Sequence, residues 1–162
     1  MREHIQIDVD EVFNHELVSL TKALAGIELI QTGQESWEKR DTLVETIYTN
    51  GDFNSFILLE VESELFEYIV SMMHGGSPPK EEEKPLYMNE YINIICGRAI
   101  SVINNERGNT SRLSVPTFHG NVMEEAYEKF GTEQRILLYK TEKGLMRFVI
   151  YYTFQKRQGG CS

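Results

Sequence analysis

Two runs of mainly β-branched and apolar residues, 42–49 and 53–61, are separated by only three residues that include Asn50 and Gly51. An Asn-Gly pair accepts the positive φ angles of the tight turns that join antiparallel strands. The two runs are therefore predicted to pair as a β-hairpin, which favours an antiparallel sheet. A second hairpin is expected from residues 135–139 and 145–154.

Apolar residues at helical spacing predict helices over residues 9–25, 63–74 and 86–106. Glycines follow each of them, as is typical of helix ends. The order is helix, hairpin, helix, helix, strand, hairpin, with Pro116 interrupting the strand over residues 111–119. This order predicts an α/β protein of the α+β type, with a mostly antiparallel sheet, long helices packed on it and a weak internal two-fold repeat.

The chain has 162 residues and a net charge of −9. This length suits one domain, expected over residues 1–157, with a flexible tail over residues 158–162. The negative charge argues against nucleic acid or an anionic membrane as the main partner, because both favour Lys and Arg. No apolar run approaches the roughly 20 residues that span a bilayer, and no signal peptide opens the chain, so a cytoplasmic location is expected.

The helix expected over residues 86–106 places an acid and an amide on one face. Each residue advances about 100°, so with Glu90 at zero, Asn93 falls at about −60°. The apolar residues gather on the opposite side, at roughly 120° to 220°: Met88, Ile92, Ile95, Ala99, Val102 and Ile103. Glu90 and Asn93 are therefore expected to point outward together.

An outward carboxamide next to a carboxylate suits a narrow chemistry. The amide of Asn93 has a donor and an acceptor, so it can hold a water molecule without gaining or losing a proton. The carboxylate of Glu90 can pair with a lysine of a partner. The alternative is an ordinary solvated helix face, on which both residue types are common.

Two neighbours favour a docking surface over a plain solvated face. Gly97 lies on the same side as Glu90 and Asn93, although glycine costs about 1 kcal/mol relative to alanine inside a helix. Its missing side chain would let another backbone approach. Ile94 adds an apolar side chain to the same face, so Ile94 and Gly97 are predicted to contact a partner.

Residues 89–99 contain Glu90 and Asn93, and 22 residues separate Asn93 from Pro116. This pattern resembles the signature of the CheC/CheX/FliY family of chemotaxis phosphatases, which is Glu, two residues, Asn, and then Pro a little over twenty residues later. Residues 13–28 and 66–76 resemble two further helices of its CheX branch. The likeness covers most of the chain in order.

The resemblance implies a CheC-like fold and a phosphatase that hydrolyses the aspartyl phosphate of the response regulator CheY. It further implies that Asn93 orients the attacking water and that Glu90 contacts the lysine of the regulator. The Mg²⁺ would belong to the regulator, so no cofactor or metal site is expected in this chain. A homodimer is also implied, and residues 149–154 would form an apolar edge that needs covering if they were unpaired.

The sequence departs from the family pattern at two places. Some relatives have Asp four residues before the Glu, where this chain has Leu86. In the first helix the nearest counterpart of the pair is Glu16 and Ser19, without the amide, so one working site is expected. Two alternatives stay open: a non-catalytic adaptor that binds a receiver or dimerises, and a small-ligand-binding domain with a pocket between helices and sheet.

Overall fold

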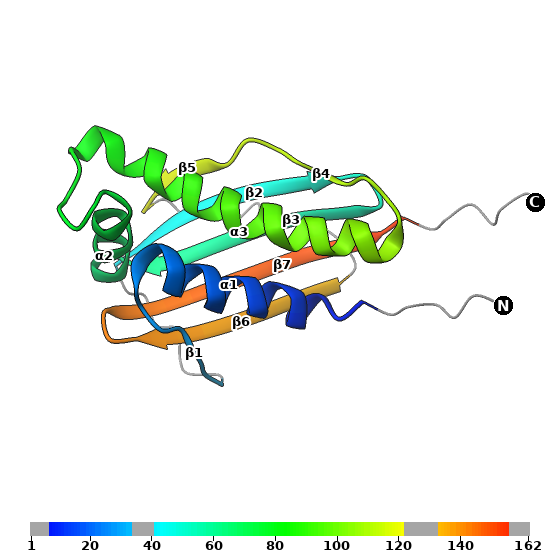
Figure 1. Cartoon of the computed structure of the whole chain (residues 1–162), viewed down its shortest axis with the longest axis horizontal. Helices are drawn as coiled ribbons and strands as arrows, with labels where there is room; N and C mark the ends of the chain where they lie inside the picture. The colour runs from blue at the N-terminus through cyan, green and yellow to red at the C-terminus, as the bar shows by residue number, and fades with distance from the viewer. Residues whose placement is uncertain (1–6, 34–40, 122–132, 156–162) are drawn as a thin grey trace, which may run out of the picture.

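The computed structural model describes residues 7–33, 41–121 and 133–155, which form two layers (Figure 1). One layer is a seven-stranded sheet whose paired strands all run antiparallel. The other layer consists of helices that lie on one face of this sheet. The predicted α+β class is therefore confirmed, whereas the predicted tail, residues 158–162, lies outside the described residues.

The helices begin and end close to the predicted positions: α1 at Val9–Ala25, α2 at Ser63–Met73 and α3 at Lys84–Arg107, with a 3-10 turn at Glu81–Glu83 before α3. The Asp8 side chain caps α1 by accepting a hydrogen bond from the Glu11 N–H at 3.1 Å. Gly26 and Gly108 end α1 and α3 in the left-handed region, at φ of 65° and 68°. None of the helices in the described ranges is long and apolar enough to cross a membrane.

The strands are β1 Ile30–Gln31, β2 Thr42–Asn50, β3 Phe53–Glu62, β4 Arg112–Leu113, β5 Thr117–Gly120, β6 Glu133–Thr141 and β7 Gly144–Phe154. Both predicted hairpins form, as β2–β3 and β6–β7. The expected strand before and after Pro116 becomes β4 and β5, which both pair with β2. Pro116 lacks the N–H that a continuous strand would need, which explains the break.

The strand order β1-β6-β7-β3-β2-β4 has an internal symmetry. Read from its other end, the order places β4 where β1 was, β2 where β6 was and β3 where β7 was. In chain order, α1, β1, β2 and β3 therefore correspond to α3, β4, β6 and β7. This is the weak two-fold repeat expected from the sequence. Because β7 pairs with β6 on one side and with β3 on the other, residues 149–154 are not an edge. The edge argument for a covering partner is therefore wrong.

The main core lies between the helices and the sheet. It contains the apolar stripe predicted for α3 except Val102, which is half-buried and lines a groove instead. The largest fully buried side chains of the core include Phe13, Phe53, Tyr91, Tyr139 and Phe148. The opposite sheet face carries a smaller buried cluster around Val44, Phe56, Leu58 and Val149. Burial on the helix side holds α1, α2 and α3 against the sheet.

Two polar side chains near the C-terminal end of α3, Asn104 and Arg107, hold it against the sheet. Arg107 pairs with Asp52 in the β2–β3 turn, with its Nη2 3.0 Å from Oδ1, and its guanidinium lies 4.3 Å from the ring centre of Phe154. The Asn104 side chain donates to the Ser111 carbonyl at 3.1 Å and accepts from the Ser111 N–H at 2.8 Å. These contacts fix α3 relative to β2, β3 and β4.

Candidate functional site

Glu90 and Asn93 lie on the solvent side of α3, where the helical spacing predicted them to be. Both side chains are exposed. Neither makes a hydrogen bond or ion pair within the described ranges. Their carboxylate and carboxamide are therefore accessible to another molecule and are not used to hold this fold together.

The residues between and around this pair are buried, which makes the pair part of a rigid surface. Tyr91, Ile92, Ile95 and Cys96 are each 0–1% exposed and face the core. The Tyr91 hydroxyl lies 2.6 Å from the Thr21 hydroxyl of α1 in a buried hydrogen bond. A side chain on a helix fixed in this way needs little reorganisation to meet a partner.

Ile94 and Gly97 are half-buried on the same side of α3 as the acid and the amide. A Cβ atom on Gly97 would lie 3.7 Å from Cδ1 of Leu113 in β4, which is ordinary van der Waals contact. The helix therefore borders the β4–β5 segment at this point. The structure places both predicted partner-binding residues next to the pair, and their contact with a partner stays a prediction.

The segment between β4 and β5 carries the signature proline beside α3. Ser114 fixes this segment to β2, because its N–H donates to the Tyr48 carbonyl at 2.8 Å and its hydroxyl accepts from the Tyr48 N–H at 2.9 Å. Val115 follows and is exposed, and Pro116 is half-buried. The segment that carries Pro116 is thus held in a fixed position beside α3.

Glu45 lies beneath α3 and was not singled out from the sequence. Its side chain faces the helix layer, and it is 1% exposed. Neither carboxyl oxygen has a hydrogen-bond partner among the described residues. Burial raises its pKa to about 8. Its register in β2, two residues from Leu43 and from Ile47, is the signal that could have placed it on the buried face.

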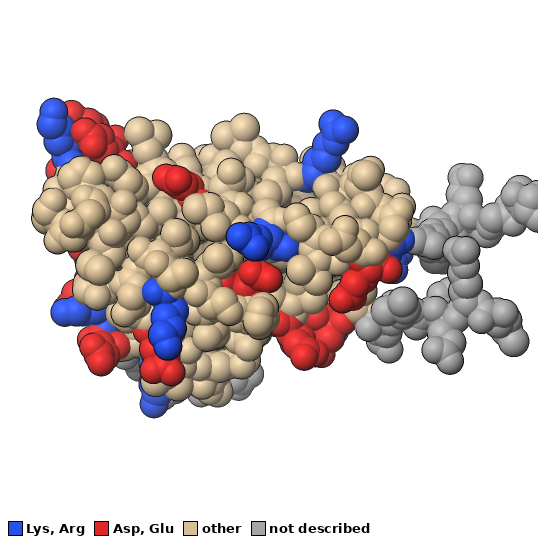
Figure 2. Space-filling model, viewed as in Figure 1, with Lys and Arg blue, Asp and Glu red and all other residues tan. Residues whose placement is uncertain are grey.

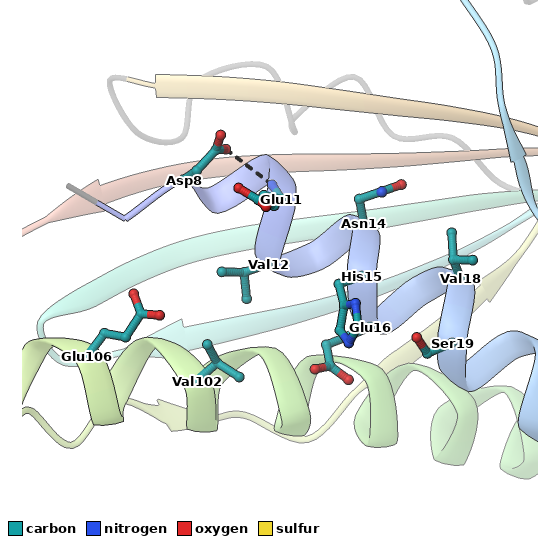
Figure 3. Close-up of a pocket in the computed structure, with 10 residues that line it drawn as sticks. All are labelled: Asp8, Glu11, Val12, Asn14, His15, Glu16, Val18, Ser19, Val102 and Glu106. Carbon is teal, nitrogen blue, oxygen red and sulfur yellow. Dashed lines mark hydrogen bonds between the residues drawn. The ribbon is translucent and has the colours of Figure 1, made fainter. Parts of the chain in front are cut away.

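A groove between α1 and α3 is separate from Glu90 and Asn93 (Figure 3). Glu16 and Ser19 line it from α1, and Val102 and Glu106 line it from α3. On the helical wheel Val102 is about 120° from Glu90, so this groove opens on another side of α3. Glu16 and Ser19, the α1 counterpart of the pair, therefore border a separate surface, and Ser19 is exposed there.

Among the described residues, no three or more His, Cys, Asp or Glu side chains lie together in a group that could hold a metal ion. The groove of Figure 3 contains several acids on α1 and α3, yet their carboxylates do not converge on one point. The face of α3 that carries Glu90, Asn93, Ile94 and Gly97 thus offers an acid, an amide and an apolar side chain.

Comparison with solved structures identifies the fold. The crystal structure of the chemotaxis protein CheX from Vibrio vulnificus matches with a TM-score of 0.78 and 18% identity, over 93% of this chain and 100% of that chain. The CheX–CheY–BeF3–Mg²⁺ complex from Borrelia burgdorferi matches with a TM-score of 0.71 and 17% identity, over 91% and 99%. Thermotoga maritima FliY matches with a TM-score of 0.60 and 16% identity, over 87% and 85%. The chain therefore has a CheC-like α+β fold.

The sequence itself identifies the family. The family model described as "Chemotaxis phosphatase CheX" matches residues 44–137, a range that includes Glu90, Asn93 and Pro116. A search of curated protein sequences finds no significant match. The model covers more than half of the chain, so the chain belongs to the CheX family of chemotaxis phosphatases. The resemblance seen in the sequence and the prediction of a phosphatase are thereby confirmed.

Proposed function

We propose that this protein hydrolyses the aspartyl phosphate of a CheY-like receiver domain by inserting Asn93 and Glu90 into the phosphorylated site of that domain. The single observation that carries this is the exposed, unpaired state of both side chains on a helix that is fixed at its buried face. Membership of the CheX family and the fold shared with the CheX–CheY complex support it.

In this proposal Asn93 supplies the position of the attacking water. Phosphoryl transfer needs the nucleophile in line with the leaving oxygen and little covalent chemistry from the protein. The carboxamide can accept from the water and donate to a phosphoryl oxygen without changing its own protonation. The aspartyl phosphate and the Mg²⁺ that neutralises its charge both belong to the receiver, so the protein contributes geometry.

Glu90 has a docking role in the same proposal. Its carboxylate lies one helical turn before Asn93 and pairs with a lysine of the receiver through a charge-assisted hydrogen bond. This contact fixes the angle at which the amide enters. Ile94 and Gly97 let the receiver approach α3 closely, because one is apolar and the other has no side chain.

The direct experiment measures decay of phosphorylated receiver domains from the same organism with and without the protein. Wild-type protein is expected to accelerate decay of at least one receiver. Positioning a water contributes at most a few orders of magnitude, so Asn93→Ala should remove nearly all acceleration while binding persists. Asn105→Ala is the matched control, since Asn105 is an exposed asparagine of the same helix. Absence of acceleration for every receiver would refute the proposal.

A non-catalytic adaptor of the same fold is the second candidate. The observation that favours it is Leu86, which stands where some relatives have Asp. Such an adaptor would bind a phosphorylated receiver and leave its decay rate unchanged. The same decay assay, combined with a binding titration, separates the two candidates.

The proposal includes a homodimer, which the family resemblance implies, and a cytoplasmic location, which is expected from the absence of a long apolar run or signal peptide in the sequence. Light scattering coupled to size-exclusion chromatography tests the dimer, for which the mass should be twice 18.8 kDa. A single 18.8 kDa species at micromolar concentration would contradict it.

A further inference from the structure

Two large apolar side chains border the candidate site and are strongly exposed. Leu86 is 64% exposed and Val115 is 85% exposed. Single exposed apolar residues are common on protein surfaces. Leu86 lies on the stripe of α3 that also carries Glu90 and Asn93, whereas Val115 lies on the β4–β5 segment that borders α3 near Gly97.

Leu86 extends the exposed stripe of α3 towards its N-terminal end. On the helical wheel it falls at about −40° relative to Glu90, between Glu90 and Asn93 in angle and one turn earlier along the axis. Lys84, two residues earlier, is 7% exposed and pairs with Glu67 of α2 at 2.9 Å. The start of α3 is therefore held firmly, and Leu86 is presented on a fixed backbone.

Val115 is exposed on the β4–β5 segment that borders α3 near Gly97. It follows Ser114, whose backbone and side chain are both hydrogen-bonded to Tyr48 of β2. It lies two residues after Leu113, whose Cδ1 would lie 3.7 Å from a Cβ on Gly97. The exposed side chain of Val115 thus belongs to the segment that runs beside α3.

The charge of this surface is low. Of the stripe formed by Leu86, Glu90, Asn93 and Gly97, only Glu90 is charged, and the exposed Arg98 next to Gly97 carries the opposite charge. Figure 2 shows uncharged atoms over much of α3 and the neighbouring β4–β5 segment, with one basic cluster over the middle of the helix and one acidic cluster nearer its N-terminal half, in a chain whose net charge is −9. Long-range charge attraction is therefore a weak means of holding a partner here, and burial of apolar area is the stronger one available.

We propose that Leu86 and Val115 are apolar anchors that select receiver domains with apolar side chains beside their phosphorylation site. This inference rests on the proposed function, and it adds the chemistry of the preferred partner. Some relatives have Asp at the position of Leu86, which would suit a polar or basic contact. Leu86 cannot make that polar contact, and it stabilises the complex only when an apolar group of the receiver covers it.

The anchors act on binding, since neither side chain can hold a water or a proton. Burying an additional apolar side chain commonly contributes enough to change a dissociation constant about tenfold, and 1.4 kcal/mol corresponds to that factor. Leu86→Ser and Val115→Ser should each raise KM about five- to tenfold, with kcat at saturating receiver unchanged within about twofold.

The experiment uses the full-length protein and the receiver that wild type dephosphorylates best, phosphorylated with acetyl phosphate. KM and kcat come from decay rates over a range of receiver concentrations, and Kd for the beryllofluoride-loaded receiver comes from calorimetric titration. Ile136→Ser is the matched control, because Ile136 is 50% exposed but lies on β6, outside the site. Circular dichroism melts confirm that each variant is folded.

The outcomes separate this inference from the proposed function. A rise in KM and Kd for the Leu86 and Val115 variants alone supports the anchors. If these variants change KM and Kd no more than Ile136→Ser, or if they lower kcat instead, the anchors are wrong while the phosphatase proposal stands. A wild-type protein that binds no receiver overturns both. A wild-type protein that binds a receiver without hydrolysing its phosphate supports the adaptor. In that case the Kd values of the Leu86 and Val115 variants alone test the anchors.

Discussion

The carboxyl group of Glu45 on β2 lies close to the thiol of Cys96 on α3, and both side chains are buried between the sheet and the helix. Burial raises the pKa of both groups, and the Glu45 carboxylate raises that of Cys96 further. Phe118 and Leu59 flank Glu45 in the register of the sheet. The helix that carries Glu90 and Asn93 thus rests on an acid in an apolar environment.

This acid makes stability depend on pH. Its pKa rises from an ordinary value of 4.5 to about 8 in the fold. Between these values the folded state keeps a proton that the unfolded chain has lost, so the free energy of unfolding falls as pH rises. The stabilisation that this retained proton provides is complete below about pH 4.5, declines as the pH rises to about 8 and is lost above that. Its size is about 1.4 kcal/mol per unit of pKa shift.

Glu45→Gln removes this titration and keeps the size of the side chain. The variant should match wild type at pH 5 and exceed it by a few kcal/mol in free energy of unfolding at pH 9. Urea denaturation at several pH values gives the difference. Glu64→Gln, at an exposed position of α2, controls for the loss of one negative charge. A difference between Glu45→Gln and wild type that does not vary with pH would contradict the prediction.

The buried hydrogen bond between Thr21 and Tyr91 joins α1 to α3 at the level of the site. Thr21→Val leaves the Tyr91 hydroxyl without its partner and should lower stability by about 1–3 kcal/mol. Tyr91→Phe should cost less, because the threonine hydroxyl can turn to a carbonyl of its own helix.

A double-mutant cycle measured by urea denaturation tests this coupling. The double variant should lose less than the sum of the single losses, because neither hydroxyl then remains buried alone. Additive losses would show that the two groups do not stabilise the contact between the helices.

Gly51 in the β2–β3 turn is required for the fold. Its φ is +127°, and a Cβ atom there would lie 2.9 Å from Cα of Ser111. Gly51→Ala should therefore lower the free energy of unfolding by at least about 2 kcal/mol, because both the backbone angle and the close approach become unfavourable. Gly33→Ala is the control, since nothing lies within 4 Å of its added Cβ. Equal melting temperatures for the two variants would refute this requirement.

Gly97 in α3 should behave in the opposite way. Gly97→Ala makes only an ordinary contact with Leu113 and gains helix propensity, so stability should rise by up to about 1 kcal/mol. The added methyl group nevertheless stands on the docking face, so KM for the receiver should increase. Thermal melts and decay kinetics on the same samples check both effects. Unchanged KM would remove Gly97 from the predicted partner contacts.

Much of this molecule could be predicted from local sequence signals. The turn at Gly51, the glycines after α1 and α3, and the break at Pro116 all act through backbone angles or a missing N–H, which depend on one or two residues. The outward direction of Glu90 and Asn93 follows from the helical repeat, which is equally local.

Other features depended on which segments meet in space. β7 lies in the centre of the sheet, whereas the sequence alone left open whether residues 149–154 would form an apolar edge that needs covering. Glu45 looked like one polar residue in a β-rich run, and only α3 above it and β5 beside it remove its carboxyl group from water.

The sequence by itself determined the elements, the class of fold and the face on which the acid and the amide stand, because those depend on periodicity and turn chemistry. The tertiary structure decided that the β4–β5 segment runs beside α3, that Val115 is exposed on this segment and that a protonatable acid lies beneath the helix. These features arise from contacts between residues far apart in the chain, where burial changes both the exposure and the charge of a side chain.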